Sequence, residues 1–486
     1  MIEEVRNLEP KIVWNHFADL NAVPRASKKE EQIQQFMMDF GQSLGLETIK
    51  DKTGNIIIRK PATPGMENKK TAVLQGHLDM VHQKNGNTNF DFSTEGIKMY
   101  IDGDWVKARG TTLGADNGLG VAAAMAVLSS NDIQHGPIEA LFTADEETGM
   151  TGANNLEPGW VKGDILLNLD TEDEGELCIG CAGGIDTSVS FLYSSENVPS
   201  SYQTFKLNIK GLFGGHSGCD IHLQRGNSNK MLARLLTLIQ QKFDVRLVSF
   251  EGGSLRNAIP REVLSTVTVE ASNASAMKAI IQEFESVVRN EHKNTDPDLI
   301  IEFEAVEDAA KHIIREDNFK IIQSLNAARN GVYRMSNDFE GLVETSTNMS
   351  RVAVKDGVMV VDFLTRSSVE EPKIDLKNQI ESVFSLIGAK VTHGGSYPGW
   401  TPNPDSAILE TMKGIHKEFF GTEPVVSAIH AGLECGIISR TQTQLDMISF
   451  GPTIKNAHSP DEKAHIGTTE RFWKYLLKIL KDFPEK

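Results

Sequence analysis

The sequence predicts an α/β domain with a central, mostly parallel sheet, interrupted by an inserted α+β domain. Short apolar runs that suit buried strands alternate with helical patterns from the start to residue 186. The same alternation returns over 397–486. Between them, residues 187–396 carry the pattern strand, helix, strand, strand, helix, twice over, which indicates a weak internal repeat. We therefore expect one domain built from 1–186 and 397–486, and a second built from 187–396.

Composition limits the classes of function. A chain of 486 residues exceeds one ordinary core, so two or three domains are expected. The formal net charge of −17 argues against nucleic acid and anionic membranes as partners, because phosphate binding needs clustered Lys and Arg. We see no secretory leader pattern and no apolar run near the ~20 residues of a membrane helix, so we expect a cytoplasmic protein. Four cysteines do not make a disulfide framework in so long a chain.

The N-terminal part predicts two helices followed by a strand. Apolar residues recur at helical spacing over 10–20 and again over 28–46, and residues 21–27 form a loop between them. Residues 53–60 begin with a glycine-containing turn and continue as a β-branched run, which is typical of a strand.

Residues 71–79 form a short apolar run that ends in His77 and Asp79. Side chains at i and i+2 project from the same face of a strand, so the two can lie together. This arrangement suits a metal-binding imidazole whose orientation a carboxylate sets. Alone, the pair is more typical of a structural histidine and a turn aspartate, so its function depends on partners elsewhere in the chain.

A glycine-rich loop at 110–120 holds Asp116 and precedes a helix of small apolar residues at 121–128. The spacing differs from that of a dinucleotide-binding loop, and an aspartate at a helix entrance would repel a pyrophosphate. We therefore interpret Asp116 as a possible ligand. A hairpin at 100–108 precedes this loop.

Two more predicted strands end in acidic residues. Residues 138–147 end with Glu146 and Glu147, and residues 164–170 end with Asp170. Ligands of open α/β sheets bind outside the carboxyl ends of the strands, so these side chains should converge with His77. Clustered carboxylates repel one another without a cation.

The remaining elements follow the same reasoning. In the insertion we expect a first copy from 205–209, 229–241, 253–270 and 276–289, and a second from 299–304, 317–328, 344–366 and 376–386. After it we expect a helix at 406–420, a turn into a helix at 428–436, a strand at 445–450 and a helix at 468–480. The loop after the strand displays His458.

The resulting candidate site contains two imidazoles and several carboxylates: His77, Asp79, Asp116, Glu146, Glu147, Asp170 and His458. Imidazole and carboxylate ligands suit zinc, and an aspartate able to bridge suits two ions. An oxygen-rich, open site is typical of catalytic rather than structural zinc.

Five motifs in this order resemble those of the co-catalytic zinc aminoacylase/carboxypeptidase family of peptidases: GHLDMV at 76–81, GADNG at 114–118, DEETG at 145–149, LDTE at 169–172 and NAHSP at 456–460. The resemblance covers the chain from end to end and includes GHSG at 215–218 and YPGWTPN at 397–403. It implies a zinc-exopeptidase fold whose catalytic domain is 1–186 plus 397–486, with 187–396 as its lid.

The resemblance also implies roles for the residues. His77 and Asp170 would hold one of two divalent metal ions, expected to be Zn²⁺, and Glu147 and His458 the other. Asp116 would bridge them, next to an Asp–Asn peptide bond that is often cis in the family. Asp79 would orient His77, and Glu146 would be the general base.

In the lid, the resemblance implies three substrate-binding residues. His216 would stabilise the oxyanion with Asn257 nearby, and Arg366 would bind the substrate's carboxylate. Without the resemblance, His216 is more typical of a loop residue, Asn257 of a turn residue and Arg366 of a surface charge. Because His216 and Asn257 lie in the first copy and Arg366 in the second, we hypothesise that the duplicated lid completes the site within one chain. A homodimer remains compatible with the sequence.

The implied activity is hydrolysis of unblocked dipeptides, including Xaa-His dipeptides such as β-alanyl-histidine. The alternatives are an N-acyl amino acid amidohydrolase or tripeptidase with the same two-metal site, and a non-catalytic peptide-binding protein. The expected partner is a small peptide, not nucleic acid or a membrane.

Overall fold

The computed structural model describes residues 2–486, which divide into two compact units. Unit 1 contains the chain up to Gly180 together with Trp400–Ala428 and Leu433–Lys486. Unit 2 contains Cys181–Gly399 and Ile429–Gly432. The insertion expected at 187–396 thus falls within unit 2. No described helix has both the length and the apolar character that a membrane span requires.

Unit 1 is built on an eight-stranded mixed sheet. Its strands, in spatial order, are β1 (Glu47–Lys50), β2 (Ile56–Lys60), β6 (Ile138–Thr143), β3 (Ala72–His77), β7 (Ile165–Asn168), β23 (Asp446–Ser449), β8 (Glu176–Cys181) and β22 (Val425–Ile429). The run β6-β3-β7-β23 is parallel throughout, as the sequence predicts, and its strands are buried on both faces.

The register of this parallel core aligns its carboxyl ends. His77 lies opposite Thr143, Gln75 opposite Asn168, and Asn168 opposite Ser449. The loops that follow these strands therefore leave the sheet at one edge, which is where ligands bind in α/β sheets.

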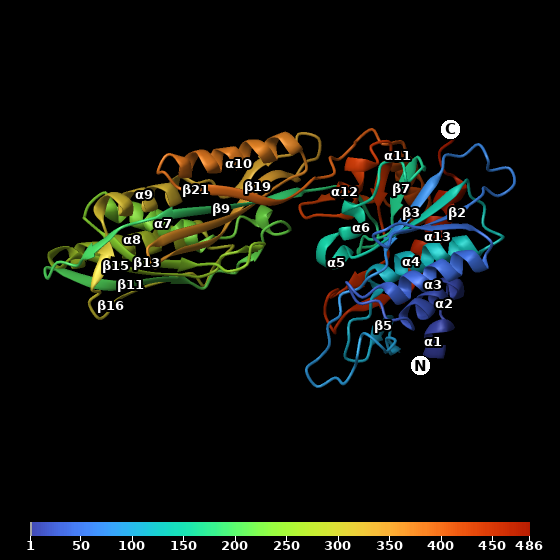
Figure 1. Cartoon of the computed structure of the whole chain (residues 1–486), viewed down its shortest axis with the longest axis horizontal. Coiled ribbons are helices and arrows are strands. Elements are labelled where there is room, and N and C mark those ends of the chain that lie inside the picture. The colour runs from blue at the N-terminus through green and yellow to red at the C-terminus, as the bar shows by residue number, and fades with distance from the viewer. Residues whose placement is uncertain (1) are drawn as a thin grey trace. The chain divides into compact units, whose positions relative to one another are not determined.

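The helices of unit 1 surround this sheet: α1 (Ile2–Arg6), α2 (Lys11–Asn21), α3 (Glu31–Ser43), α4 (Ala115–Ser129), α5 (Glu146–Gly149), α6 (Thr151–Asn154), α11 (Ala407–Phe420), α12 (Glu434–Thr441) and α13 (Ile466–Lys481). Figure 1 shows α2, α3 and α4 gathered along one side of it. Almost every residue of α4 is buried, because its small apolar side chains contact α2 and β3 on opposite sides. Its helical hydrogen bonds begin at Ala115, earlier than the expected 121, although Asp116 and Asn117 keep non-helical backbone angles.

A small four-stranded sheet completes unit 1. It contains β24 (Ile454–Lys455), β25 (Lys463–His465), β5 (Trp105–Ala108) and β4 (Met99–Asp102), in that order. The pairing of β25 with β5 joins the loop that carries His458 to the hairpin predicted at 100–108.

Unit 2 is built on a nine-stranded sheet whose main path is antiparallel. In order the path is β16 (Ile300–Ala305), β11 (Tyr202–Lys210), β15 (Val263–Glu270), β13 (Arg246–Gly252), β19 (Val343–Lys355), β20 (Val358–Ser367), β9 (Gly183–Leu192) and β21 (Lys390–Tyr397), with β18 (Gly331–Met335) beside β19. Two short pairs accompany it: β10 (Ser195–Asn197) with β17 (Lys311–Ile313), and β12 (Gly215–His216) with β14 (Ala258–Ile259).

Four helices lie along one side of this sheet (Figure 1): α7 (Ser228–Gln240), α8 (Ala274–Glu291), α9 (Arg315–Ala327) and α10 (Glu370–Ser385). A continuous apolar core, which includes Phe205, Phe250, Phe363 and Phe384, fills the space between helices and sheet. Two 3₁₀ turns, Ile221–Leu223 and Ala271–Asn273, join other elements of the unit.

The two halves of the path have the same connectivity. From one edge the first set runs β16, β11, β15, β13, which are its fourth, first, third and second strands in chain order. From the other edge the second set runs β21, β9, β20, β19, with the same ranks. The expectation that 299–304 opens the second copy was wrong, because β16 pairs with β11 and closes the first set. In the chain, the second set begins with β9, before the first set, and ends with β21, after it. The first set therefore lies within the second.

Candidate functional site

His77 is the last residue of β3 and lies at the centre of the polar cluster in unit 1. Its side chain is 1% exposed. The Nε2 atom lies 3.0 Å from Asp116 Oδ1 and 3.6 Å from Asp170 Oδ1. The Nδ1 atom lies 3.1 Å from the carbonyl oxygen of Asp79 and 3.4 Å from its Oδ1. Both ring nitrogens therefore face oxygen atoms.

Asp116 connects His77 to a second group of side chains. Its Oδ2 atom lies 3.0 Å from His458 Nε2, and that nitrogen lies 3.0 Å from Glu147 Oε2. Of the four groups of possible metal ligands among the described residues, two contain Asp116: His77 with Asp116 and Asp170, and Asp116 with Glu147 and His458. The Asp116–Asn117 peptide bond is cis, as the resemblance implies.

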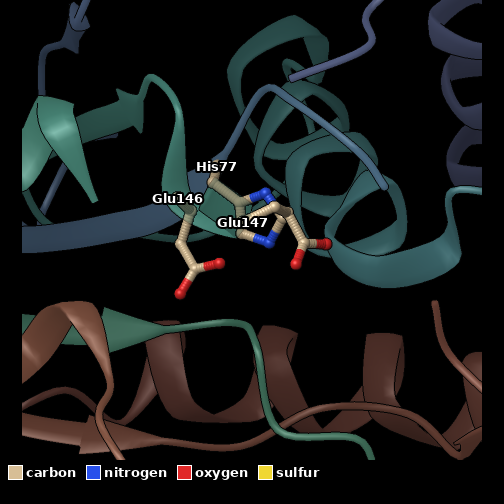
Figure 2. Close-up of side chains that lie close together, drawn as sticks. All are labelled: His77, Glu146 and Glu147. Atoms are coloured by element: carbon tan, nitrogen blue, oxygen red, sulfur yellow. The ribbon is translucent and has the colours of Figure 1, made fainter. Parts of the chain in front are cut away.

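Glu146 and Glu147 lie in a helical turn instead of the expected end of a strand. Strand β6 ends at Thr143, Asp145 adopts a left-handed conformation, and α5 then starts at Glu146. Consecutive residues of a helix point about 100° apart. Figure 2 accordingly shows the two carboxyl groups on different sides of the His77 ring.

The carboxylate of Asp79 holds this turn in place. It is fully buried and accepts the backbone N–H groups of Glu146, at 3.0 Å, and Glu147, at 3.2 Å. Asp79 therefore contacts the turn with both carboxylate oxygens while one of them also approaches the His77 ring.

Electrostatics in this cluster favour a cation. Burial, reinforced by neighbouring carboxylates, raises the pKa of Glu146 well above its usual range and that of Asp170 to about 6. Hydrogen bonds to Asp116 and Glu147 raise the pKa of His458 to about 11. Burial disfavours a charged His77, yet Asp170 and Asp116 still raise its pKa well above the usual value. The excess of negative charge in this cluster therefore favours proton binding by its carboxyl and imidazole groups.

Two buried carboxylate oxygens of the cluster make no hydrogen bond. Within residues 2–486, Glu147 Oε1 and Asp170 Oδ1 are buried and make no hydrogen bond. An orphaned buried carboxylate oxygen is costly unless a cation binds it. These atoms belong to different ligand sets, so the residues present fit a metal ion at each set.

Unit 2 brings together the three residues predicted in the insertion. The pairing of β12 with β14 places His216 opposite Ala258, next to Asn257, whose carbonyl accepts the Ser217 N–H at 2.8 Å. A methyl group added at Gly218 would lie 3.1 Å from the His216 ring and 3.2 Å from Arg366 Nε. His216 and Arg366 therefore flank Gly218.

The hydrogen bonds of His216 define its tautomer. Its Nδ1 atom accepts the backbone N–H groups of Gly218 and Cys219, at 3.2 and 3.0 Å. Burial and the Arg366 charge lower its pKa, which favours the neutral ring. A neutral imidazole with Nδ1 as acceptor carries its proton on Nε2, so Nε2 is a donor.

Arg366 is buried but keeps an unused donor. Its Nη1 donates to the Tyr397 hydroxyl at 2.9 Å, whereas its buried Nε has no partner within residues 2–486. His430, which sequence reasoning missed, is buried nearby with Nε2 2.8 Å from Ser346 Oγ. Burial, and next the Arg366 charge, lower the pKa of His430 to about 3.

Sequence reasoning also missed three buried charged residues of unit 1, namely Arg25, Glu434 and Glu462. Glu434 accepts hydrogen bonds from Gln75 and Thr143, at 2.8 and 2.6 Å, and so joins β3 to β6. Glu462 accepts four backbone N–H groups of the loop that carries Asp116. The sequence offered one indication of this role, which is that Glu462 lies four residues after His458.

Comparison with known proteins gives consistent results. The model of peptidase family M20/M25/M40 matches residues 73–482. The chain is 42% identical over 485 residues to the cytosol non-specific dipeptidase of Escherichia coli, with 100% of both chains covered. The crystal structure of aminoacylhistidine dipeptidase from Vibrio alginolyticus has 46% identity and a TM-score of 0.96, and covers 99% of this chain and 98% of that one. Aminopeptidase PepT from Bacillus cereus, at 16% identity and a TM-score of 0.56 over 98% and 99% of the chains, shares the fold.

Proposed function

The chain belongs to peptidase family M20/M25/M40, and from this premise we propose that it is a metal-dependent dipeptidase acting on unblocked dipeptides, Xaa-His dipeptides among them. One observation carries the proposal: two ligand sets share Asp116 beside Glu146 in a chain that is similar over its full length to two dipeptidases. The name of the Escherichia coli relative also supports a cytosolic location for this chain.

The family implies divalent metal, and the described residues include groups that could hold it. We assign His77 and Asp170 to one ion, Glu147 and His458 to a second, and Asp116 to both. Zinc is the proposed metal, because imidazole and carboxylate are its usual catalytic ligands. When bound, the metal would polarise the peptide carbonyl and acidify the attacking water.

Glu146 is the proposed general base. Its carboxyl group lies within 4.8 Å of the ligand atoms of His77 and Glu147, and burial raises its pKa, which helps it to hold a proton between accepting and releasing it. It would take a proton from the attacking water and pass it to the leaving amine. Asp79 would keep Glu146 in position through the backbone of α5.

Unit 2 would supply the groups that recognise the peptide. The Nε2–H of neutral His216 suits an oxyanion, and Asn257 would assist it. The buried guanidinium of Arg366 suits the free carboxylate of a dipeptide. Because His216 and Asn257 lie within the first set of strands and Arg366 in the second, we propose that the duplicated insertion of one chain supplies all three in cis. In mixtures of His216→Ala and Glu146→Ala chains, recovered activity would contradict that arrangement.

Substrate profiling of the zinc-loaded protein tests the activity. We expect hydrolysis of unblocked dipeptides, with tripeptides and N-acyl amino acids cleaved far more slowly. Preferential cleavage of N-acyl amino acids or tripeptides would replace the proposal with an amidohydrolase or a tripeptidase. Peptide binding without hydrolysis, in both metal-free and zinc-loaded protein, would indicate a non-catalytic binding protein.

A further inference from the structure

Glu462 binds the backbone of the loop that carries Asp116. The side chain is 2% exposed. One carboxylate oxygen accepts the N–H groups of Leu113 and Gly114, at 2.7 and 2.9 Å, and the other those of Ala115 and Asp116, at 2.8 and 3.2 Å. A carboxylate offers about four acceptor sites, so backbone donors of this loop use its full capacity.

Arg25 binds the same loop through a backbone carbonyl group. Its buried guanidinium donates to the carbonyl oxygen of Gly114, and to those of Leu78 and Asp79 at 3.2 Å each. Gly114 has a φ of 70°, and a Cβ atom there would lie 2.5 Å from Arg25 Nη2. The close approach of guanidinium and backbone therefore requires glycine.

These two side chains join three segments that are distant in sequence. Glu462 belongs to the loop that carries His458, and the strand β25 that follows pairs with β5. Arg25 contacts the residues directly after His77. Together they connect the segments of His77, Asp116 and His458, which supply ligands to both proposed metal ions.

We propose that Glu462 is a positioning residue of the metal centre, which together with Arg25 sets the place of Asp116 between His77 and His458. The proposal rests on the proposed function in one respect, the role of Asp116 as a bridging ligand. Glutamine in place of Glu462 would direct an amide N–H₂ at two backbone donors and so displace the loop. Ligands held slightly out of place bind metal more weakly, typically by 10–100-fold for the loss of a supporting contact.

Glu139 offers a matched control within unit 1. It is also buried, at 3% exposure, accepts the backbone N–H groups of Lys162 and Gly163 at 2.8 and 2.9 Å, and pairs with an arginine, Arg59, at 2.7 Å. It lies near the start of β6, whereas the proposed ligand Glu147 follows the end of that strand. Replacing Glu139 therefore shows how the loss of a buried carboxylate that binds no ligand-bearing loop affects zinc affinity and stability.

The experiment compares the full-length Glu462→Gln and Glu139→Gln variants with the wild type. Zinc affinity of the metal-free proteins is measured by competition with a chromogenic chelator, and folding by circular dichroism and thermal melting. We expect Glu462→Gln to bind both ions about 10–100-fold more weakly. We expect Glu139→Gln to bind them with about wild-type affinity even if it melts earlier, since it touches no ligand-bearing loop.

Equal zinc affinities in the two variants would overturn the proposal, whatever their melting temperatures. If Glu462→Gln fails to fold, Glu462→Asp against Glu139→Asp decides by the same criterion, because aspartate keeps the charge on a shorter arm. A wild type that binds two zinc ions but cleaves no peptide would refute the proposed function alone. A wild type that binds no zinc would refute both proposals.

Discussion

The polar cluster of unit 1 and that of unit 2 give histidine opposite properties. In unit 1, carboxylates raise the pKa of His77 and His458. In unit 2, burial and the Arg366 charge lower the pKa of His216 and His430. An acidic cluster thus favours positive charge on the imidazole or on an ion that it binds, and a neighbouring guanidinium favours the neutral ring.

This difference identifies the kind of partner each cluster suits. The unit 1 cluster has more carboxylates than imidazoles, and within residues 2–486 Glu147 Oε1 and Asp170 Oδ1 make no hydrogen bond, so the cluster suits metal cations. The unit 2 cluster has a buried guanidinium with an unused donor, so it suits an anion such as a peptide carboxylate.

The largest effect is expected from Glu146→Gln, which removes a carboxylate from unit 1 without removing an assigned ligand. Loss of the general base should lower kcat by roughly 10²–10⁴-fold, with little change in KM. Steady-state kinetics and a zinc count by atomic absorption check this. A protein that loses zinc together with activity would show that Glu146 acts as a ligand instead.

Arg366→Met should have the next largest effect, because it removes the cation of unit 2. Loss of a charge-assisted hydrogen bond of about 1.5–3 kcal/mol should lower kcat/KM for dipeptides by roughly 10–100-fold, with zinc content unchanged. Dipeptide amides serve as matched substrates. The wild type should discriminate against them and the variant should not; equal discrimination by both proteins would exclude a carboxylate contact.

His430 should make the folded protein sensitive to acid. Its folded pKa of about 3 lies below the value of 6.5 expected when unfolded, so the unfolded chain binds the additional proton between these values. Stability from this group is complete above pH 6.5 and is lost as the pH falls toward 3, by about 2 kcal/mol between pH 7 and pH 5.

Urea unfolding of the full chain at pH 7 and pH 5 checks this prediction. His430→Gln should lose about 2 kcal/mol less than the wild type over that interval. Ser346→Ala, which removes the hydrogen-bond partner but keeps the ring, should retain the wild-type pH dependence. The same pH dependence in all three proteins would contradict a neutral buried His430.

Asp79→Asn should produce the smallest change, because the amide keeps an oxygen for one of the two backbone N–H groups of α5. We expect about a tenfold loss of kcat with both zinc ions retained. Kinetics with a parallel zinc count check it. Loss of both ions would contradict the assignment of Asp79 as a supporting residue.

Local patterns were sufficient to find the residues that line the site. His77, Glu147 and Asp170 follow apolar runs that could only be buried strands, and parallel strands end at one edge. The loops that carry Asp116 and His458 completed the candidate set, and the family resemblance supplied the roles. The roles of these residues remain proposals, while the structure shows that their side chains lie together.

The sequence by itself determined the α/β class, the insertion and the side chains that meet in unit 1, because hydrophobic periodicity and strand ends are local properties. Only the tertiary structure decided that β16 pairs with β11, that Glu146 begins a helical turn, and that Arg25 and Glu462 are buried around Gly114. Strand pairing and the burial of a charge depend on segments distant in the chain: Glu462, for example, binds backbone groups 346 to 349 residues away. No local pattern records which distant backbone donors will surround a loop glutamate such as Glu462.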